Sequence, residues 1–380
     1  MTQKTVYILG AGFSMEFGAP SQSNLLKAIF NLRQHPIYGN KKQIEEWLYE
    51  LNTFLLKGLH VTDEQIVHYS LEDIYTPIDK SILEFISFRN YTPIQLLQLR
   101  DKINRLVILA IRSEIETNKD KKKGIDKFAR LLVEKCKVRI ENEKEDLVSV
   151  ITTNWDIILD NKIFNVINED EIPKGHKFSG VLDYCCYISS LTEKDEKIKP
   201  GLYALGKGRY NVKLLKLHGS LNWLQCPKCS RLFVKLYQDF NGGYVIAKKY
   251  CRHCNKNFPD VNKDTNCLYT NLITPTFLKN LNNVQNKLVW QNAAIELSEA
   301  SKIIFLGYSL PHADFEFKQL LSRMIRTNAD IEVVLIKDDN PENYHDKQKY
   351  NAAGYRFENF FSGRNLKISY EGVANYLEKL

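Results

Sequence analysis

Short β-rich runs alternate with helical stretches along most of the chain, and this alternation predicts the fold class. The first run, Lys4–Leu9, ends in a glycine turn and precedes a helical stretch through Leu25, Leu26 and Ile29. Strand-type runs return before polar or glycine-containing turns at Leu147–Thr152, Val212–Leu217, Lys302–Leu306 and Glu332–Ile336. Because helical segments separate these strands, the pattern predicts an α/β fold with a Rossmann-like, doubly wound parallel sheet.

The middle of the chain has a different pattern, typical of a helical insertion. Long apolar-periodic stretches cover 94–115 and 125–138, and a lysine-rich joint at 119–124 separates them. The predicted domains are a Rossmann-like domain made of 1–35, 146–225 and 268–380, a large helical insertion at 36–145, and a small zinc-ribbon-like module at 226–267.

Composition and charge are those of an ordinary globular protein. Of the 380 residues, 44% are hydrophobic and 26% are charged, and no run of about 18 apolar residues predicts a membrane span. The N-terminal segment reaches its glycine turn before a signal-peptide core could be completed, so we expect a cytoplasmic protein that does not enter membranes. The net charge of +8 is scattered apart from a cluster at 121–123, which favours a solvated surface and leaves DNA contact open.

Four cysteines have the spacing of a metal site: Cys226, Cys229, Cys251 and Cys254 form two Cys-x-x-Cys pairs. Disulfides are unlikely in reducing cytoplasm, and four thiolates complete a tetrahedral zinc site with no open position for a substrate. The predicted zinc is therefore structural. Four buried thiols are the alternative, His253 or Cys267 could compete as a ligand, and the remaining cysteines, Cys136, Cys185 and Cys186, are predicted to be core residues.

The glycine turn after the first strand is a candidate nucleotide site. Gly10 and Gly12 would let the backbone approach a pyrophosphate, and the next helix would direct its N-terminal amides at the negative charge. The spacing is not the full dinucleotide fingerprint because Met15 occupies the place of the third glycine. A tight turn with no ligand also explains two glycines.

Polar side chains follow three further strands, at the ends where open α/β sheets bind ligands. Asn154 and Asp156 could read polar groups of a cofactor, and His218 is a candidate general base. Gly307 and Ser309 fit a phosphate or ribose contact. The competing interpretations are strand-end capping, a structural histidine and a bare turn.

Taken in order, the motifs Gly-Ala-Gly-Phe-Ser, Thr-Thr-Asn-Trp-Asp, His-Gly-Ser, paired Cys-x-x-Cys and Gly-Tyr-Ser-Leu resemble the sirtuin superfamily. The resemblance implies that NAD is the substrate and that the Cys₄ module is structural. It implies NAD-binding roles for Gly10, Ala11, Gly12, Phe13, Ser14, Thr153, Gly307 and Ser309. It further implies that Asn154 and Asp156 hold the nicotinamide end and the reactive ribose, and that His218 lies beside the ribose hydroxyls.

Two segments depart from the pattern of deacylating sirtuins. Ser21-Gln22-Ser23 replaces the Asp-Phe-Arg element that closes over nicotinamide, and the segment 271–277 lacks the Phe-Gly-Glu element that pairs with an acyl-lysine peptide. The chain is more similar to the sirtuin-like effectors of bacterial antiphage defence, which hydrolyse NAD to nicotinamide and ADP-ribose, and particularly to those that act with HerA-type ATPases. The resemblance implies an oligomer and such an ATPase as partner.

The sequence thus predicts an NAD hydrolase with Asn154, Asp156 and His218 as catalytic residues. In this hypothesis Asn154 positions water or the ribose, Asp156 holds the carboxamide, and His218 handles the proton. Three other functions stay open: an NAD-dependent protein deacylase, a nuclease subunit assembled with the ATPase, and a module that senses NAD or ADP-ribose without turnover.

Overall fold

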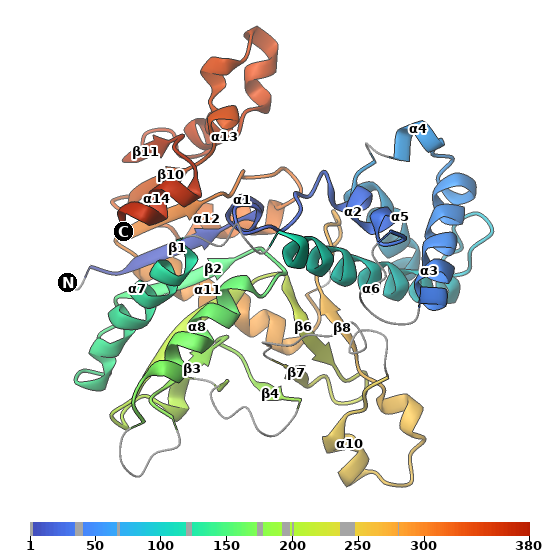
Figure 1. Ribbon diagram of the computed structural model, residues 1–380, viewed down its shortest axis with the longest axis horizontal. Helices are drawn as coiled ribbons and strands as arrows, with labels where there is room; N and C mark the ends of the chain where they lie inside the picture. The colour runs from blue at the N-terminus through green and yellow to red at the C-terminus, as the bar shows by residue number, and fades with distance from the viewer. Residues whose placement is uncertain are drawn as a thin grey trace.

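Seven parallel strands form the central sheet, which confirms the predicted fold class (Figure 1). The computed structural model describes residues 3–34, 41–66, 69–118, 124–172, 178–191, 198–199, 201–235, 248–279 and 281–380. The strands are β1 (Thr5–Leu9), β2 (Val148–Thr152), β3 (Gly180–Asp183), β5 (Tyr210–Lys216), β9 (Lys302–Leu306), β10 (Asp330–Val334) and β11 (Leu366–Ser369). Their order is β11-β10-β9-β1-β2-β5-β3, and every neighbouring pair is parallel.

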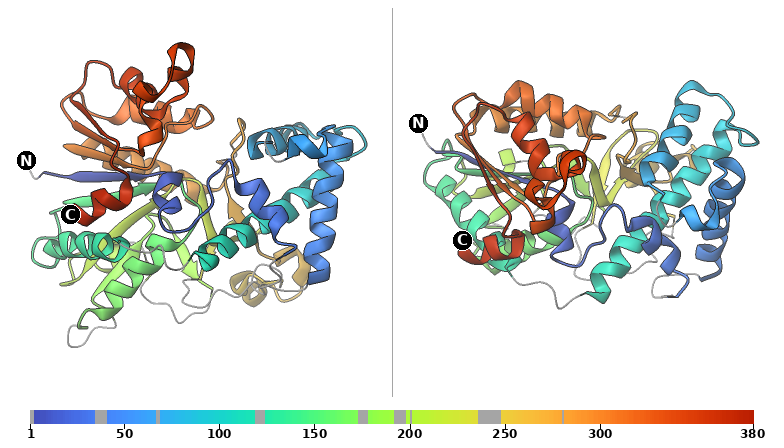
Figure 2. Two further views of the ribbon diagram at one scale, coloured as in Figure 1. Left: turned by 45° about the horizontal axis from the view of Figure 1, so that its top comes forward. Right: turned by 90° about the horizontal axis from the view of Figure 1, so that it is seen from above.

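The central strands are continuous apolar runs because helices cover the sheet on both faces (Figure 2). All of β2 is buried, as are four of the five residues of β1. Helices α7 (Ile125–Lys137) and α8 (Ile158–Glu169) pack against each other and against β2, β3 and β5, while α11 (Val284–Glu299) packs against β5 and α12 (Phe315–Met324). Short helices complete this part of the chain: α1 (Ala11–Met15), α13 (Ala353–Phe360) and α14 (Val373–Lys379).

Strand β1 lies at the point where the strand order reverses. The chain builds β2 and β5 on one side of β1, then returns to build β9, β10 and β11 on the other. The loops that leave β1, β2, β5 and β9 therefore meet at one edge of the sheet, where open α/β sheets form their ligand crevice.

The predicted helical insertion forms a second body beside the sheet (Figure 1). Its longest helix, α6, begins at a capping box in which Thr92 and Gln95 bond each other's backbone amides, with Pro93 in the first turn. The body contains α2 (Leu25–Asn31), α3 (Lys41–Thr53), the π-helical turn η1 (Phe54–Gly58), α4 (Asp63–Ile66), α5 (Leu71–Glu84) and α6 (Pro93–Thr117).

Helix α7, predicted within the insertion, packs with the sheet instead, since Phe128 and Leu132 belong to the sheet's hydrophobic core. We therefore propose to place the end of the insertion near 118; the lysine-rich joint, at 119–123, lies outside the described residues. Helix α2, predicted within the Rossmann-like domain, packs against α6 in the helical body, and we propose to place it there as well. The other predicted domain limits stay a prediction.

A second, four-stranded sheet carries the cysteine pairs. It consists of β4 (Ile188–Ser190), β7 (Leu232–Val234), β6 (Gly219–Gln225) and β8 (Tyr269–Leu272), in the order β4-β7-β6-β8. Helix α10 (Arg252–Asn257) begins directly after Cys251 and contains Cys254. Strand β6 begins one residue after His218, so the chain enters the second sheet directly from the edge of the central sheet where the ligand crevice lies. Six 3₁₀ turns complete the described secondary structure: η3 (Val138–Ile140), η4 (Gly201–Tyr203), η5 (Lys263–Asn266), η6 (Lys337–Asp339), η7 (Pro341–Asn343) and η8 (Asp346–Asn351). Within the described ranges, no helix has the length and apolar character to span a bilayer.

Candidate functional site

A pocket with an empty volume of about 930 Å³, part of it open to solvent, lies at the carboxyl edge of the central sheet. Seven of the predicted site residues line it: Ala11, Ser14, Thr153, Asn154, Asp156, His218 and Ser309. The helical body also lines the pocket, through Leu71, Glu72 and Ile111. The structure thus brings polar residues that follow four different strands, β1, β2, β5 and β9, to one cavity.

The glycines of the first turn pack against the loop after β9. The amide of Gly12 donates to the carbonyl oxygen of Gly307 at 2.8 Å, and a Cβ on Gly307 would lie 2.3 Å from the amide nitrogen of Phe13. Gly307 also has a φ of +59°, a backbone conformation that residues other than glycine disfavour. A Cβ on Gly10 or Gly12 would lie within 2.8 Å of the carbonyl oxygen of Gly307, so all three glycines are needed for this close backbone contact, in which Phe13 takes part through its amide. These residues adjoin the pocket residues Ala11 and Ser309 along the chain.

Asn154, Ser14 and Asp156 form one chain of hydrogen bonds. The Asn154 Nδ2 group donates to the carbonyl oxygen of Gly10 at 2.7 Å and to Ser14 Oγ at 2.8 Å. The Ser14 hydroxyl donates in turn to Asp156 Oδ2 at 2.5 Å, and Asp156 Oδ1 accepts the backbone amide of Ile158 at 3.0 Å. Both amide hydrogens of Asn154 are thus committed, which orients its carbonyl oxygen Oδ1 as an acceptor for a ligand.

His218 is 8% exposed and is held by one hydrogen bond, from Nδ1 to the carbonyl oxygen of Thr153 at 3.2 Å. Because a carbonyl only accepts, Nδ1 carries the proton and the neutral ring has its lone pair on Nε2. Nε2 is buried and has no hydrogen-bond partner among the described residues. Burial lowers the pKa of His218 to about 4, so the ring is a free base at neutral pH.

A carboxylate that the sequence analysis did not single out faces this histidine. Asp314 Oδ1 lies 3.7 Å from His218 Nε2 and 2.6 Å from Lys279 Nζ, and Tyr308 donates to Asp314 Oδ2 at 3.0 Å. Burial alone would raise the pKa of Asp314, but the positive charges of a protonated His218 and of Lys279 lower it. Since His218 is neutral at neutral pH, Lys279 is the cation that keeps Asp314 ionised.

These missed residues differ in how visible they are in the sequence. Asp314 lies in the segment between β9 and α12 and immediately precedes that helix, just as Asp156 lies between β2 and α8. Lys279 lies in an irregular segment with no pattern to mark it, and only the fold brings it to Asp314, 35 residues further along the chain.

Behind the pocket, a buried ion pair fixes the loop that carries Asp156. Lys216 is 2% exposed; its ammonium donates to the backbone carbonyl of Asp156 and lies 3.1 Å from Asp160 Oδ2. Burial raises the pKa of Asp160, while Lys216 and the hydroxyl of Tyr184 oppose that shift by bonding the ionised form. Lys216 therefore ties the end of β5 to the start of α8.

Replacing Lys216 with methionine is expected to lower the free energy of unfolding by about 3–5 kcal/mol, because it leaves the Asp160 carboxylate buried without its cation. Urea unfolding measures the change. The matched control is Lys302→Met, which removes a partly exposed partner of Glu332 and should cost about 1 kcal/mol or less. Equal losses in the two variants would contradict this account of Lys216.

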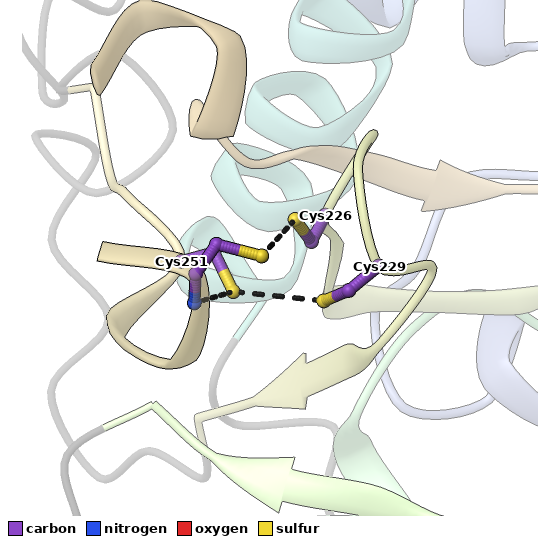
Figure 3. A group of neighbouring side chains, drawn as sticks. Cys226, Cys229 and Cys251 are labelled. Carbon is purple, nitrogen blue, oxygen red and sulfur yellow. Dashed lines mark hydrogen bonds between the residues drawn. The ribbon is translucent and has the colours of Figure 1, made fainter. Parts of the chain in front are cut away.

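The four predicted cysteine ligands come together, and they fit a tetrahedral metal. Their sulfur atoms all lie within 4.8 Å of one another, with Cys226 to Cys254 and Cys229 to Cys251 both at 3.8 Å. A zinc–sulfur bond of about 2.3 Å gives sulfur–sulfur edges of about 3.8 Å in a tetrahedron. Figure 3 shows the sulfurs of Cys226, Cys229 and Cys251 directed toward one another. All four cysteines are free of disulfides, so the cluster is compatible with a structural zinc.

The competing ligands and the other cysteines lie elsewhere. His253 is partly buried and contacts Asn257, and the Cys267 thiol contacts the carbonyl of Leu268, so neither joins the cluster. Cys136 and Cys186 are buried in the core of the main sheet as predicted, and Cys185 is partly buried against it.

Three carboxylates also gather at the opposite, amino-terminal edge of the sheet. Asp146, Glu296 and Glu299 lie close enough to hold a metal, but Lys4 is 2.7 Å from an oxygen of each. Lys213 and Arg139 pair with the same group. These cations occupy the place that a metal would take, so the cluster is an ion-pair network.

No family model matches the chain, and no curated protein sequence matches it. Among solved structures the chain is similar to sirtuins. A structure of Sir2Tm bound to a propionylated peptide has 12% identity and a TM-score of 0.37 over 99% of this chain and 91% of that one. A Sir2 complex with a p53 peptide and NAD⁺ has 13% identity and a TM-score of 0.39 over 99% and 91%. A mutant Sir2 homologue in complex with ADP-ribose has 13% identity and a TM-score of 0.38, over 99% of this chain and 93% of that one. The fold class rests on the strand order described above, not on these likenesses.

Proposed function

We propose that this protein is an NAD glycohydrolase, which cleaves NAD to nicotinamide and ADP-ribose. The observation that carries the proposal is the convergence of Asn154, Asp156 and His218 on one pocket at the carboxyl edge of a doubly wound sheet. In two of these side chains an acceptor is left over: His218 Nε2 has no hydrogen-bond partner among the described residues, and both amide hydrogens of Asn154 are committed, which leaves its Oδ1. This is the constellation that the sirtuin-like motifs imply.

The proposed reaction replaces a carbon–nitrogen bond with a carbon–oxygen bond. The bond between the ribose and nicotinamide breaks, its electron pair stays with the nicotinamide nitrogen, and the oxygen of water bonds to the ribose carbon. Asn154 Oδ1 would hold the water or a ribose hydroxyl, and the negative charges around the pocket favour the positive charge that develops on the sugar. His218 Nε2 would take up the proton that water loses.

The remaining proposed NAD contacts depend on which backbone amides already donate hydrogen bonds within the protein. The amides of Gly12 and Gly307 are committed to protein carbonyls, so we propose that these glycines, with Gly10 and Phe13, shape the floor beneath the dinucleotide. Ala11, Ser14, Thr153 and Ser309 line the cavity and would contact NAD directly.

Water, rather than an acyl-lysine peptide, is the proposed acceptor. The segment that replaces the peptide-pairing element is bound to the helical body: Thr274 contacts both Arg100 and Asp79 at 3.1 Å, and Thr276 contacts Thr76 at 3.4 Å. In addition, Gln22 donates to Glu72, which joins the loop after α1 to α5. These contacts favour hydrolysis over the deacylase alternative.

We further propose that NAD depletion by this protein serves antiphage defence, in a cytoplasmic homo-oligomer that acts with a HerA-type ATPase. The motif resemblance supports this setting, and the net charge of +8 leaves room for DNA contact. The nuclease alternative gains no support from the carboxylates of Asp146, Glu296 and Glu299, because lysine and arginine side chains form ion pairs with them where a catalytic metal would bind.

The pH dependence of kcat/KM tests the role of His218. A base with a pKa of about 4 is neutral at pH 6 and above, so activity should be constant there and fall on the acid side with a midpoint near 4. An ordinary histidine would give a midpoint near about 6.5. His218→Gln should remove activity, whereas His312→Gln, at an exposed site two residues before Asp314, should keep it. An active His218→Gln enzyme would remove this residue from the mechanism.

A further inference from the structure

We propose that Asp314, held by Lys279 and Tyr308, is a positioning residue that stabilises the His218 imidazolium when the ring takes up its proton. The inference rests on the proposed function, in which His218 is the base, and it adds residues that the motifs do not assign. It concerns the electrostatic state of the histidine rather than direct contact with the substrate.

The contacts of Asp314 show what its carboxylate does. It occupies the residue before α12, a position where aspartate usually accepts backbone amides of the helix, yet it makes no such capping bond. Its oxygens instead accept from Lys279 and Tyr308, and the aspartate is 8% exposed. A purely structural cap therefore does not explain this residue.

The distance to His218 decides how Asp314 can act. The 3.7 Å between Asp314 Oδ1 and His218 Nε2 is too long for a direct hydrogen bond but short for a buried charge pair. Before proton transfer, Lys279 neutralises Asp314 and the imidazole stays uncharged. After transfer, the same carboxylate oxygen faces two cations, so its charge favours the protonated ring.

Other charges near this group are placed so that Asp314 remains the main partner. Glu316, in the first turn of α12, lies 3.4 Å from Lys279 Nζ, while Asp156 and Glu72 line the pocket without a bond to His218. Among the described carboxylates, only Asp314 lies within 4.0 Å of the imidazole. Glu316→Gln is therefore a matched control, because it also removes a carboxylate that faces Lys279.

The test is the titration of the His218 ring, followed by NMR in the protein without NAD and assigned by the signal that His218→Gln loses. Lys279→Gln should raise the titration midpoint by about one pH unit, because it removes the opposing cation. Adding Asp314→Asn to that variant should abolish the rise, whereas adding Glu316→Gln should leave most of it. The double variant of Lys279→Gln and Asp314→Asn removes both charges of the pair and leaves neither partner unpaired. It can therefore be measured even if the single variants fail to fold. If Asp314→Asn leaves the titration midpoint of the His218 ring unchanged, the proposal is overturned.

Kinetics give a second readout. Asp314→Asn should lower kcat about tenfold or more with KM changed less than about twofold, since it acts on proton transfer and not on binding. The acid limb of the pH dependence of kcat/KM should also move to lower pH in this variant, because the protonated ring loses its stabilising carboxylate. A loss of folded protein lowers the rate but does not move this limb. An unmoved acid limb would contradict the inference. If NAD is not hydrolysed at all, the proposed function fails, but the ring titration still reports whether Asp314 and His218 are coupled.

Discussion

Replacing Asn154 with alanine is expected to reduce nicotinamide release by roughly a thousandfold or more while leaving the fold intact. The side chain lines the pocket and orients Ser14 through Nδ2, so alanine removes both the proposed ligand acceptor Oδ1 and the group that holds Ser14 in its bond to Asp156. The structural cost is two hydrogen bonds, about 1 kcal/mol each. Steady-state release of nicotinamide from NAD measures the effect, with circular dichroism as the check on folding.

The control is Asn375→Ala on α14. That side chain is exposed and bonds the carbonyl of Glu371, far along the chain from the pocket loops. It removes the same amide group, so it should leave the rate within about twofold of the original. Comparable losses in the two variants, or an active Asn154→Ala protein, would remove Asn154 from the reaction centre.

Loss of the metal site should be the largest effect on stability. Zinc held by four thiolates contributes on the order of 10 kcal/mol to the folding of small zinc modules, and the cysteine loops bring little core of their own. Cys226, Cys251 and Cys254 are buried in the same cluster as Leu224, Phe233 and Leu268, so the metal also supports packing next to the helical body. We expect Cys254→Ser to bind no zinc and to lower the thermal unfolding midpoint by more than about 10 °C.

Zinc content per chain and thermal unfolding test this expectation, with Cys267→Ser as the control. Cys267 lies in the same module but outside the cluster, so its replacement should retain one zinc per chain and unfold normally. A chelator should reproduce the Cys254→Ser unfolding profile in the original protein. Normal stability after complete removal of zinc would show that the four thiols are merely buried.

The central sheet could be predicted because its strands are buried on both faces. Such strands appear as short apolar runs, and all five predicted ones match a strand of the sheet, β1, β2, β5, β9 or β10, to within about two residues. Strands β3 and β11 were missed because they are four residues long at the sheet edges, and β11 is half-exposed.

The second sheet was missed for a different reason. Strand β6 is buried along nearly its whole length, but Ser220 and Asn222 are among its fully buried residues, so no apolar run marks it, and its polar–apolar alternation covers only the four residues 220–223. Its partner β8 lies more than 40 residues further along the chain, and such long-range pairing leaves no local pattern.

The candidate site shows the same division between local and long-range information. Asn154, Asp156 and His218 each follow a parallel strand, and parallel strands bring their carboxyl ends to one edge, so their convergence was predictable. The tautomer of His218 depends on the carbonyl of Thr153, and its electrostatic partner comes from Asp314 and Lys279. Only the packed structure places these groups together.

The most direct test of the central claim is to incubate the purified protein with NAD, without any acylated peptide, and to separate the products by chromatography. The reaction is run alone and with a HerA-type ATPase, with Asn154→Ala and His218→Gln as controls. The proposed function predicts equal amounts of nicotinamide and ADP-ribose from the original protein and neither from the variants. Unchanged NAD under every condition, or nicotinamide release that requires an acylated peptide, would contradict it.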